Sequence, residues 1–333
     1  MFEIKMLNNI LNELNLSINV DNKIYNRDKS FIDNLEDILK DYIIFNIDNF
    51  ELSIQDIEGE SKKIYKDKKS DICLIRLKPT LYSYTFNRYD TVLGTDDLRY
   101  EFWDIFAKYI NNVTYDFITK GKIKCNKYIY DLLSDINFSA YYPFLTSYLG
   151  SITIDHKKYA ICRYIKNQTP LEIVWKNRLV GTMKHTLLNV DKWNTKFGES
   201  VEYEGFLPEE IVRFDWRNPC WFNGERYKDE CIPDDFANFY TDVQNAKNVC
   251  KAVSNIIDFM LNKAGYKFID TCYFINSTGN ILYSEITPDG MRIQKINNND
   301  SRFDKDLWRQ GKDRDTILKV WGELLQDLRK VEY

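Results

Sequence analysis

The sequence predicts a fold that mixes helices with strands, and two kinds of pattern lead to this prediction. Residues 1–45, residues 235–264 and the segment after Asp315 repeat apolar residues at helical spacing. Residues 43–78 and 151–184 instead alternate apolar with polar residues, as strands do. The chain has 333 residues and no repeat or low-complexity linker, so it forms either one large domain or two to three smaller ones that share a cleft.

Composition argues against several classes of function. Hydrophobic residues make up 44% and aromatic residues 15% of the chain, which supports a sizeable core rather than disorder. A net charge of −4 argues against a general nucleic-acid binder, although a local basic pocket is compatible with it. No apolar run approaches the roughly 20 residues that span a bilayer, so we expect no membrane partner.

The cysteines and histidines bear on the cellular location and on the kind of metal site that the chain could hold. The seven cysteines are scattered and form no C-x-x-C pair, and we find no signal peptide. These features predict a reducing, cytoplasmic location. His156 and His185 are too few for a His-rich metal site, so a zinc enzyme is not expected.

Residues 1–45 predict two amphipathic helices ahead of the first strands. Ile10, Leu11 and Leu14 give partial helical spacing, and Phe31 and Leu35 begin a cleaner repeat. An accessory layer, or a segment that docks a partner, is favoured over a catalytic role for this extension.

Two strand ends carry groups that suit anions. Gly59 would let backbone amides approach a phosphate that Lys62 could reach, but an ordinary charged hairpin explains the same residues. The strand of residues 171–178 runs into Gly181 and Thr182, which suit a phosphate or carboxylate as well as a solvated strand end. Residues 208–235 look like a loop, in which the charged and aromatic residues 213–217 form a substrate wall or a satisfied ion-pair network.

The C-terminal third carries the clearest pattern. A helix over residues 235–264 ends at Gly265, and a hairpin of strands 266–274 and 281–286 follows around a turn at residues 276–280. The second strand ends in Glu285, Asp289 and Arg292, a combination typical of anion-binding or metal-binding sites.

Three regions match known motifs. Residues 59–65 read G-E-S-K-K-I-Y, residues 172–182 read E-I-V-W-K-N-R-L-V-G-T, and residues 284–310 contain S-E-I-T-P-D-G-M-R and D-K-D-L-W-R-Q. In this order they resemble the SAICAR synthetase (phosphoribosylaminoimidazole-succinocarboxamide synthase) family, with its motifs G-K-x-K-x-x-Y, E-x-[IV]-V-R-N-x-x-x-G-S, D-E-x-[ST]-P-D-x-x-R and D-K-D-x-[FWY]-R-Q. The resemblance covers roughly residues 55–325, and three spaced motifs are far more specific than any one.

The resemblance implies an α+β fold of two lobes, distantly similar to protein kinases, with ATP in the cleft between them. It divides the chain into an accessory helical extension (residues 1–45), a β-rich nucleotide-binding lobe with a helical insertion (46–165) and an α/β substrate-binding lobe (166–333). It also implies an ATP-dependent ligase that activates the carboxylate of an aminoimidazole ribotide as an acyl phosphate, which the amine of L-aspartate then attacks. Such chemistry uses cations, Mg²⁺ and fixed reactant geometry around the phosphoryl group.

The resemblance further implies roles for individual residues. ATP would contact Gly59, Lys62 and Arg163. Asp289 and Arg292 would act in catalysis, and Glu285 and Asp289 would hold the metal ion. The ribotide and its phosphate would contact Lys176, Arg178, Thr182, Asp215, Arg292, Lys305 and Arg309.

The part of the implied active site that would bind nucleotide and metal departs from the family pattern. Glu60 and Cys272 stand where lysines are usual. Phe274 replaces a metal-binding glutamate, and Ser284 replaces an aspartate that also handles metal. An aromatic ring cannot ligate Mg²⁺, which takes oxygen ligands. Lys176 replaces an arginine and keeps the cation without its two-pronged fork.

These departures leave alternatives. The leading hypothesis is an ATP-dependent carboxylate–amine ligase, including a paralogue with altered substrates, that takes a phosphorylated anion and an amine such as L-aspartate. The alternative is a non-catalytic relative that binds nucleotide or phosphate and has lost its metal site. A small-molecule kinase is a third reading, but no H-R-D motif supports it. A homo-oligomeric assembly is left open.

Overall fold

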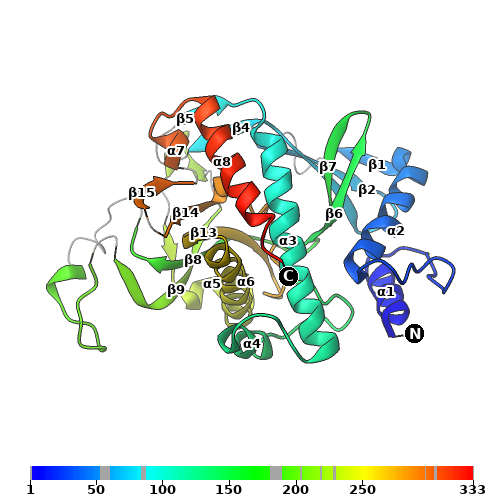
Figure 1. Cartoon of the computed structure of the whole chain (residues 1–333), viewed down its shortest axis with the longest axis horizontal. Coiled ribbons are helices and arrows are strands. Elements are labelled where there is room, and N and C mark those ends of the chain that lie inside the picture. Colours follow the sequence, from blue (N-terminus) through cyan, green and yellow to red (C-terminus); the bar gives the residue numbers. More distant parts are fainter. Residues whose placement is uncertain are drawn as a thin grey trace.

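The computed structural model describes residues 2–52, 61–83, 88–180, 190–202, 205–217, 220–227, 230–296, 298–303 and 306–332. Two large antiparallel sheets, two small two-stranded sheets and the helices packed on them make up the described structure (Figure 1). The arrangement agrees with the predicted α+β class. No helix in these ranges is long and apolar enough to cross a membrane.

The first sheet has five antiparallel strands in the order β1-β2-β3-β7-β6. They are β1 (Phe50–Leu52), β2 (Lys62–Asp67), β3 (Ile72–Leu77), β6 (Tyr148–Ile154) and β7 (Lys157–Arg163). Between β3 and β6 the chain forms the hairpin of β4 (Thr80–Ser83) and β5 (Arg88–Thr91), then helices α3 (Thr95–Lys120) and α4 (Lys127–Ser134). Strand β3 buries side chains on both faces, which explains its nearly continuous apolar sequence.

The second sheet has six antiparallel strands in the order β12-β9-β8-β13-β14-β15. They are β8 (Gln168–Arg178), β9 (Phe206–Trp216), β12 (Cys231–Ile232), β13 (Tyr266–Asn276), β14 (Met291–Lys295) and β15 (Asn298–Arg302). Helix α6 (Val243–Lys263) packs its apolar residues on one face of this sheet, in the core that also holds α3 and α8 (Arg314–Leu328). The short elements are η1 (Ile47–Asn49), η4 (Val190–Lys192), β10 (Cys220–Phe222), β11 (Glu225–Tyr227), α5 (Asp234–Ala237), η5 (Pro288–Gly290) and α7 (Asp306–Arg309).

The helices expected in residues 1–45 are present as α1 (Phe2–Glu13) and α2 (Phe31–Phe45). They cover the face of the first sheet opposite α3, at the side of the molecule that carries β1 and β2 (Figure 1). Ile72 and Leu74 of β3 join the core under α1 and α2, whereas Cys73 and Ile75 join the core under α3. The extension is therefore a packed layer, and its use as a docking segment stays a prediction.

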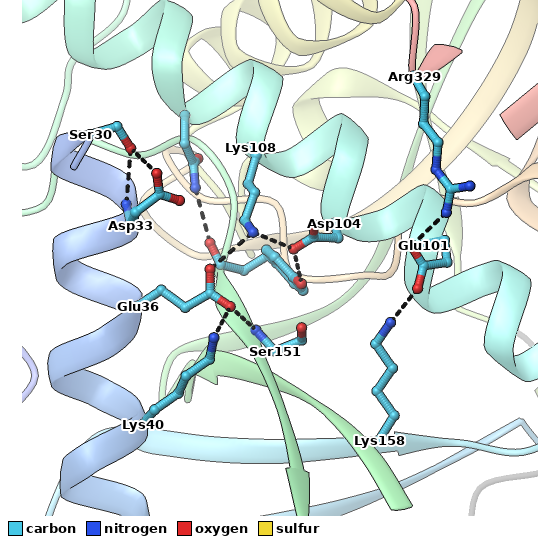
Figure 2. Close-up of polar contacts among 12 residues, drawn as sticks. Ser30, Asp33, Glu36, Lys40, Glu101, Asp104, Lys108, Ser151, Lys158 and Arg329 are labelled. Carbon is cyan, nitrogen blue, oxygen red and sulfur yellow. Dashed lines mark hydrogen bonds and ion pairs between the residues drawn. The ribbon is translucent and has the colours of Figure 1, made fainter. Parts of the chain in front are cut away.

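Glu36 of α2 anchors this layer to the first sheet and to α3 (Figure 2). Its carboxylate accepts a hydrogen bond from the backbone N–H of Ser151 at 3.0 Å and pairs with Lys108 of α3 at 2.9 Å. Gly150 permits this approach, because a Cβ atom there would lie 2.5 Å from Cγ of Glu36. The domain boundaries predicted at residues 45 and 165 stay predictions.

The predicted loop at residues 208–235 is wrong, because this segment contains most of strand β9 and the short strands β10, β11 and β12. Val212 and Phe214 are buried on one face of β9, while Arg213 and Asp215 occupy the other face. Charged residues at alternating positions, with Pro208 among them, hide the apolar period. The predicted helix over residues 235–264 starts later, at Val243, and ends before Gly265 as expected.

The predicted strand over residues 281–286 is also wrong, although the turn before it is present. Within this described segment, Leu282 forms only isolated bridges, to Ile275 and Thr146. The segment divides its backbone hydrogen bonds, since Leu282 donates to Leu145 at 2.8 Å and Tyr283 donates to Phe274 at 3.0 Å. Two different neighbours therefore replace the single ladder that a hairpin would need.

Candidate functional site

The register of the second sheet brings charged residues from three strands into one row. Lys176 of β8 pairs with Asp270 of β13, and Asp270 pairs on its other side with Arg292 of β14. Alternate residues of a strand face the same side, so Arg178 shares the face of this row. Trp175 lies on the opposite face and is buried in the core with α6.

Asp270 is the centre of this row. Its side chain is only 4% exposed, and its Oδ2 accepts hydrogen bonds from Arg292 Nη1 at 2.6 Å and Lys176 Nζ at 3.1 Å. Arg292 also donates from Nε to Asp306 of α7 at 2.9 Å. A carboxylate this buried requires such partners, because an unpaired charge would cost several kcal/mol.

Lys176 belongs to this row, and Arg309 of α7 joins it through Asp306. Burial lowers the pKa of Lys176 below its ordinary value, and the attraction of Asp270 opposes this only in part. Arg309 pairs loosely with Asp306 at 3.6 Å, and its Nε is buried without a hydrogen-bond partner among the described residues. A buried donor that lacks a partner is costly, and the role of Arg309 in binding the substrate stays a prediction.

Arg178 and Asp215 lie at the edges of this group. Arg178 donates from Nη1 to Gln294 of β14 at 2.7 Å. Asp215 accepts a hydrogen bond from Arg213 at 2.8 Å and pairs in the sheet with Glu172. Glu172 precedes Lys176 by four residues, which places Asp215 about 13 Å along the strand direction from the row.

A second cluster surrounds Glu285. Its Oε2 pairs with Lys62 of β2 at 2.7 Å, and its Oε1 pairs with Arg99 of α3 at 2.9 Å. The Arg99 side chain is fully buried. Burial alone would raise the pKa of Glu285, but the charges of Lys62 and Arg99 outweigh it and lower the pKa from 4.5 to about 2. Glu285 is therefore ionised at neutral pH, with a cation at each oxygen.

The residues beside Glu285 do not suit a metal ion held by the protein. Phe274 offers no oxygen, and Oγ of Ser284 accepts a hydrogen bond from the backbone N–H of Phe274 at 3.2 Å. In the part of the chain that the structure describes, no group of three or more His, Cys, Asp or Glu residues could hold a metal ion. Asp289 lies half-buried in η5. The metal roles of Glu285 and Asp289 and the catalytic role of Asp289 stay predictions.

The contacts described for Arg163 involve neither cluster. Its Nη2 pairs with Glu13 of α1 at 2.7 Å, and its guanidinium lies over the ring of Tyr142 at 4.5 Å. With Glu13, it lines a cavity of ≈ 310 Å³ between α1, the connection at residues 164–167 and the turn at residues 276–281. Its role in binding ATP stays a prediction. Three predicted site residues lie outside the described residues, namely Gly59, Thr182 and Lys305.

Sequence reasoning assigns no role to Arg99 and leaves that of Arg217 open. Arg99 lies beside Leu98 and Tyr100 in a helix rich in aromatic residues, and a charge within such a run is the one signal that marks it. Arg217 follows β9, which the sequence does not reveal as a strand. Asp270 lies on the strand after Gly265, which the resemblance also covers, but only the register shows that it joins two cations.

Comparison with known proteins gives this geometry a context. A sequence profile of the SAICAR synthetase family matches residues 56–324. The chain is also 24% identical over 328 residues to the Bifunctional cordycepin biosynthesis cluster protein 3 of Cordyceps militaris. That match covers 83% of this chain and 33% of the relative, so the chain spans about a third of the relative's length.

Solved structures share the fold. A SAICAR synthetase (Type-2) in complex with ADP is 18% identical, with a TM-score of 0.54, and the match covers 83% of this chain and 98% of that one. SAICAR-synthase from Saccharomyces cerevisiae complexed with SAICAR is 16% identical, with a TM-score of 0.51, covering 83% and 94%. These similarities confirm the predicted α+β fold, and they are consistent with the predicted arrangement in two lobes. The sequence profile confirms the predicted resemblance to the family. The chain belongs to the SAICAR synthetase family.

Proposed function

We propose that this protein is an ATP-dependent ligase that joins a carboxylate to an amine, and that its carboxylate substrate is anionic and phosphorylated. Membership of the SAICAR synthetase family supports a ligase of this kind. The aminoimidazole ribotide carboxylate and L-aspartate are the first substrates to test. A related anion and amine are the next, since the nucleotide half of the site departs from the family pattern.

The observation that carries this proposal is the cationic row on the second sheet. In the ion pairs that the structure describes, the cations Lys176, Arg292 and Arg309 share two carboxylates, those of Asp270 and Asp306. All three cations are less than one fifth exposed. Partly desolvated cations bind phosphate and carboxylate groups strongly, because the hydrogen bonds are charge-assisted and poorly screened.

The buried Nε of Arg309 supports an anion at this place. A donor without a partner costs about 1–3 kcal/mol, which a bound phosphate or carboxylate would recover. Arg292 is fixed from two sides by Asp270 and Asp306, so it can orient a substrate without reorganising. These residues bind and orient the anionic substrate in our proposal.

The cluster around Glu285 would serve the nucleotide. Lys62 would contact the phosphates, while Glu285, itself paired with the buried Arg99, holds the Lys62 ammonium group in place. ATP, when bound, supplies the phosphoryl group that activates the carboxylate. One matched structure is described in complex with ADP, which supports nucleotide binding as a property to test here. Phe274 and Ser284 do not suit a metal ion held by the protein at this place.

A coupled assay of ADP release tests the proposal. The purified protein is incubated with ATP, the aminoimidazole ribotide carboxylate and L-aspartate, and then with other phosphorylated carboxylates and amines. We expect ADP release that requires both the carboxylate and the amine. Absence of turnover with every ribotide, with or without aspartate, would argue strongly against a ligase.

A second candidate is a non-catalytic relative that binds nucleotide or phosphate. Phe274 and Ser284 favour it, because neither supplies a carboxylate beside the nucleotide cluster. Thermal denaturation with and without Mg-ATP examines how much of the nucleotide site is retained. A clear rise in melting temperature eliminates a protein that has lost nucleotide binding, and the ADP-release assay then separates the ligase from a binding protein.

A further inference from the structure

Two cations lie over the aromatic ring of Phe274. The guanidinium carbon of Arg217 is 3.8 Å from the ring centroid, and Nζ of Lys62 is 5.5 Å from it. Phe274 lies on β13 at the same face as Asp270, four residues farther along the strand. The ring therefore connects the cluster around Glu285 with the sheet face that holds the cationic row.

Arg217 is oriented by several described contacts with neutral groups. Its backbone N–H donates to the carbonyl of Pro170 at 2.9 Å. Its Nη1 donates to the hydroxyl of Tyr283 at 3.2 Å, and that hydroxyl donates to the carbonyl of Thr169 at 3.4 Å. Tyr283 is buried and packs beside Phe274, with ring centroids 5.7 Å apart. The guanidinium is thus oriented before any ligand arrives.

Three cations lie near the Phe274 ring, together with the carboxylates of Glu285 and of Glu172, which is opposite Phe274 in the sheet. Lys62 and Arg99 both pair with the carboxylate of Glu285, and Arg217 brings a third cation to the Phe274 ring. Oriented cations this close together suit a polyphosphate, whose oxygens accept bidentate hydrogen bonds from a guanidinium. A carboxylate-held metal ion would instead need oxygen donors where Phe274 stands.

We propose that Arg217 and Lys62 bind the phosphate groups of a nucleotide beside the ring of Phe274, and that these two cations replace a metal ion held by the protein. The inference rests on the proposed use of ATP, and it adds how the phosphates are recognised. Arg217 supplies a fork of donors, and Lys62 supplies a point charge. Phe274 shields both cations from water and strengthens their electrostatic attraction to the phosphates.

Isothermal titration calorimetry with ADP tests this proposal without requiring turnover. Titrations are run in Mg²⁺ and in EDTA, with the full chain. We expect the dissociation constants in the two buffers to agree within about threefold, a difference below 1 kcal/mol. ADP binding that weakens more than about tenfold in EDTA overturns the proposal, while leaving an ATP-dependent ligase intact.

Three variants sharpen the test. Arg217→Ala should weaken ADP binding about 10- to 100-fold in both buffers, because it removes charge-assisted hydrogen bonds. Lys263→Ala is the matched control, since Lys263 lies 4.7 Å over the ring of Phe259 on α6, and it should leave ADP binding unchanged. Phe274→Glu should weaken binding in EDTA and restore part of it in Mg²⁺. Circular dichroism spectra that match the wild type verify that each variant folds.

The outcomes separate this proposal from the proposed function. An Arg217→Ala variant that binds ADP as the wild type does overturns the role of Arg217 alone. If ADP does not bind in either buffer, inorganic pyrophosphate is the second probe. Lack of binding by both probes overturns the phosphate site and the ATP-dependent reaction together.

Discussion

Replacement of Glu285 by glutamine tests how much the buried cluster with Lys62 and Arg99 contributes to stability. The carboxylate has its pKa lowered from 4.5 to about 2, although burial alone would raise it. Because the folded-state pKa is depressed, the ion pairs stabilise the protein above pH 4.5, and this contribution is lost as the pH falls toward 2. At about 1.4 kcal/mol per pKa unit, the contribution at neutral pH is roughly 3 kcal/mol. The side chain is 16% exposed, so solvent screens it little.

Urea denaturation of the wild type and Glu285→Gln measures this contribution. We expect the variant to lose about 3 kcal/mol of unfolding free energy at pH 7 but only about 2 kcal/mol at pH 3.5, where the carboxyl group of the unfolded chain is mostly protonated and that of the folded protein is still ionised. Glu101→Gln is the matched control, because Glu101 also pairs with two cations, Lys158 and Arg329, but is 37% exposed (Figure 2). This control should lose less than about 1 kcal/mol. The reasoning fails if Glu285→Gln loses no more than the control, or loses the same amount at both pH values.

Three other substitutions have defined outcomes. Arg292→Ala should abolish ligase turnover, which enzyme kinetics measure. It should also lower the unfolding free energy by about 2–3 kcal/mol in urea denaturation, because it removes the shorter of the two described ion pairs of Asp270. Arg292→Lys should recover part of the stability. Gly150→Ala should destabilise by about 1–3 kcal/mol in thermal melts, since its Cβ would meet Glu36, whereas Gly322→Ala in α8 meets open space and should not. Glu36→Gln should lower stability at neutral pH, and the loss should become smaller below pH 4.5. Burial would raise the pKa of Glu36, but its Ser151 and lysine partners outweigh burial and lower the pKa. Unchanged stability at pH 7 would contradict this prediction.

Elements with a strong local period could be predicted from the sequence. Helix α6 buries Val249, Val253 and Ile256 on one face, and Gly265 ends it with a φ of 89°, as its pattern indicates. Strand β9 could not be predicted, because the positions that alternate with its buried apolar residues hold charges, which are locally typical of a loop. The folded sheet explains the charges at Arg213 and Asp215, because both lie on the face of β9 opposite the buried Val212 and Phe214.

Some residues of the candidate site could likewise be predicted from the sequence, and others could not. Motifs identify Lys176, Arg292 and Glu285 as residues with special chemistry, because charges at strand ends are costly without a partner. Their partners are far away in sequence: Asp270 lies 94 residues from Lys176, and Arg99 lies 186 residues from Glu285. Such pairs are set by strand register and helix packing, which a single sequence does not contain.

Helix α3 contacts both the N-terminal layer of α1 and α2 and the cluster around Glu285. Lys108 of α3 pairs with Glu36 of α2, and Arg99, nine residues earlier in the same helix, pairs with Glu285 (Figure 2 shows the Glu36 end). These two contacts lie about 13 Å apart along a hydrogen-bonded helix, which moves as a unit more readily than it bends. A layer that lies outside the family match at residues 56–324 therefore contacts the middle of α3, and the N-terminal part of the same helix holds Glu285. Glu285 in turn pairs with Lys62, so ion pairs and one shared helix link the extension to the proposed phosphate-binding lysine.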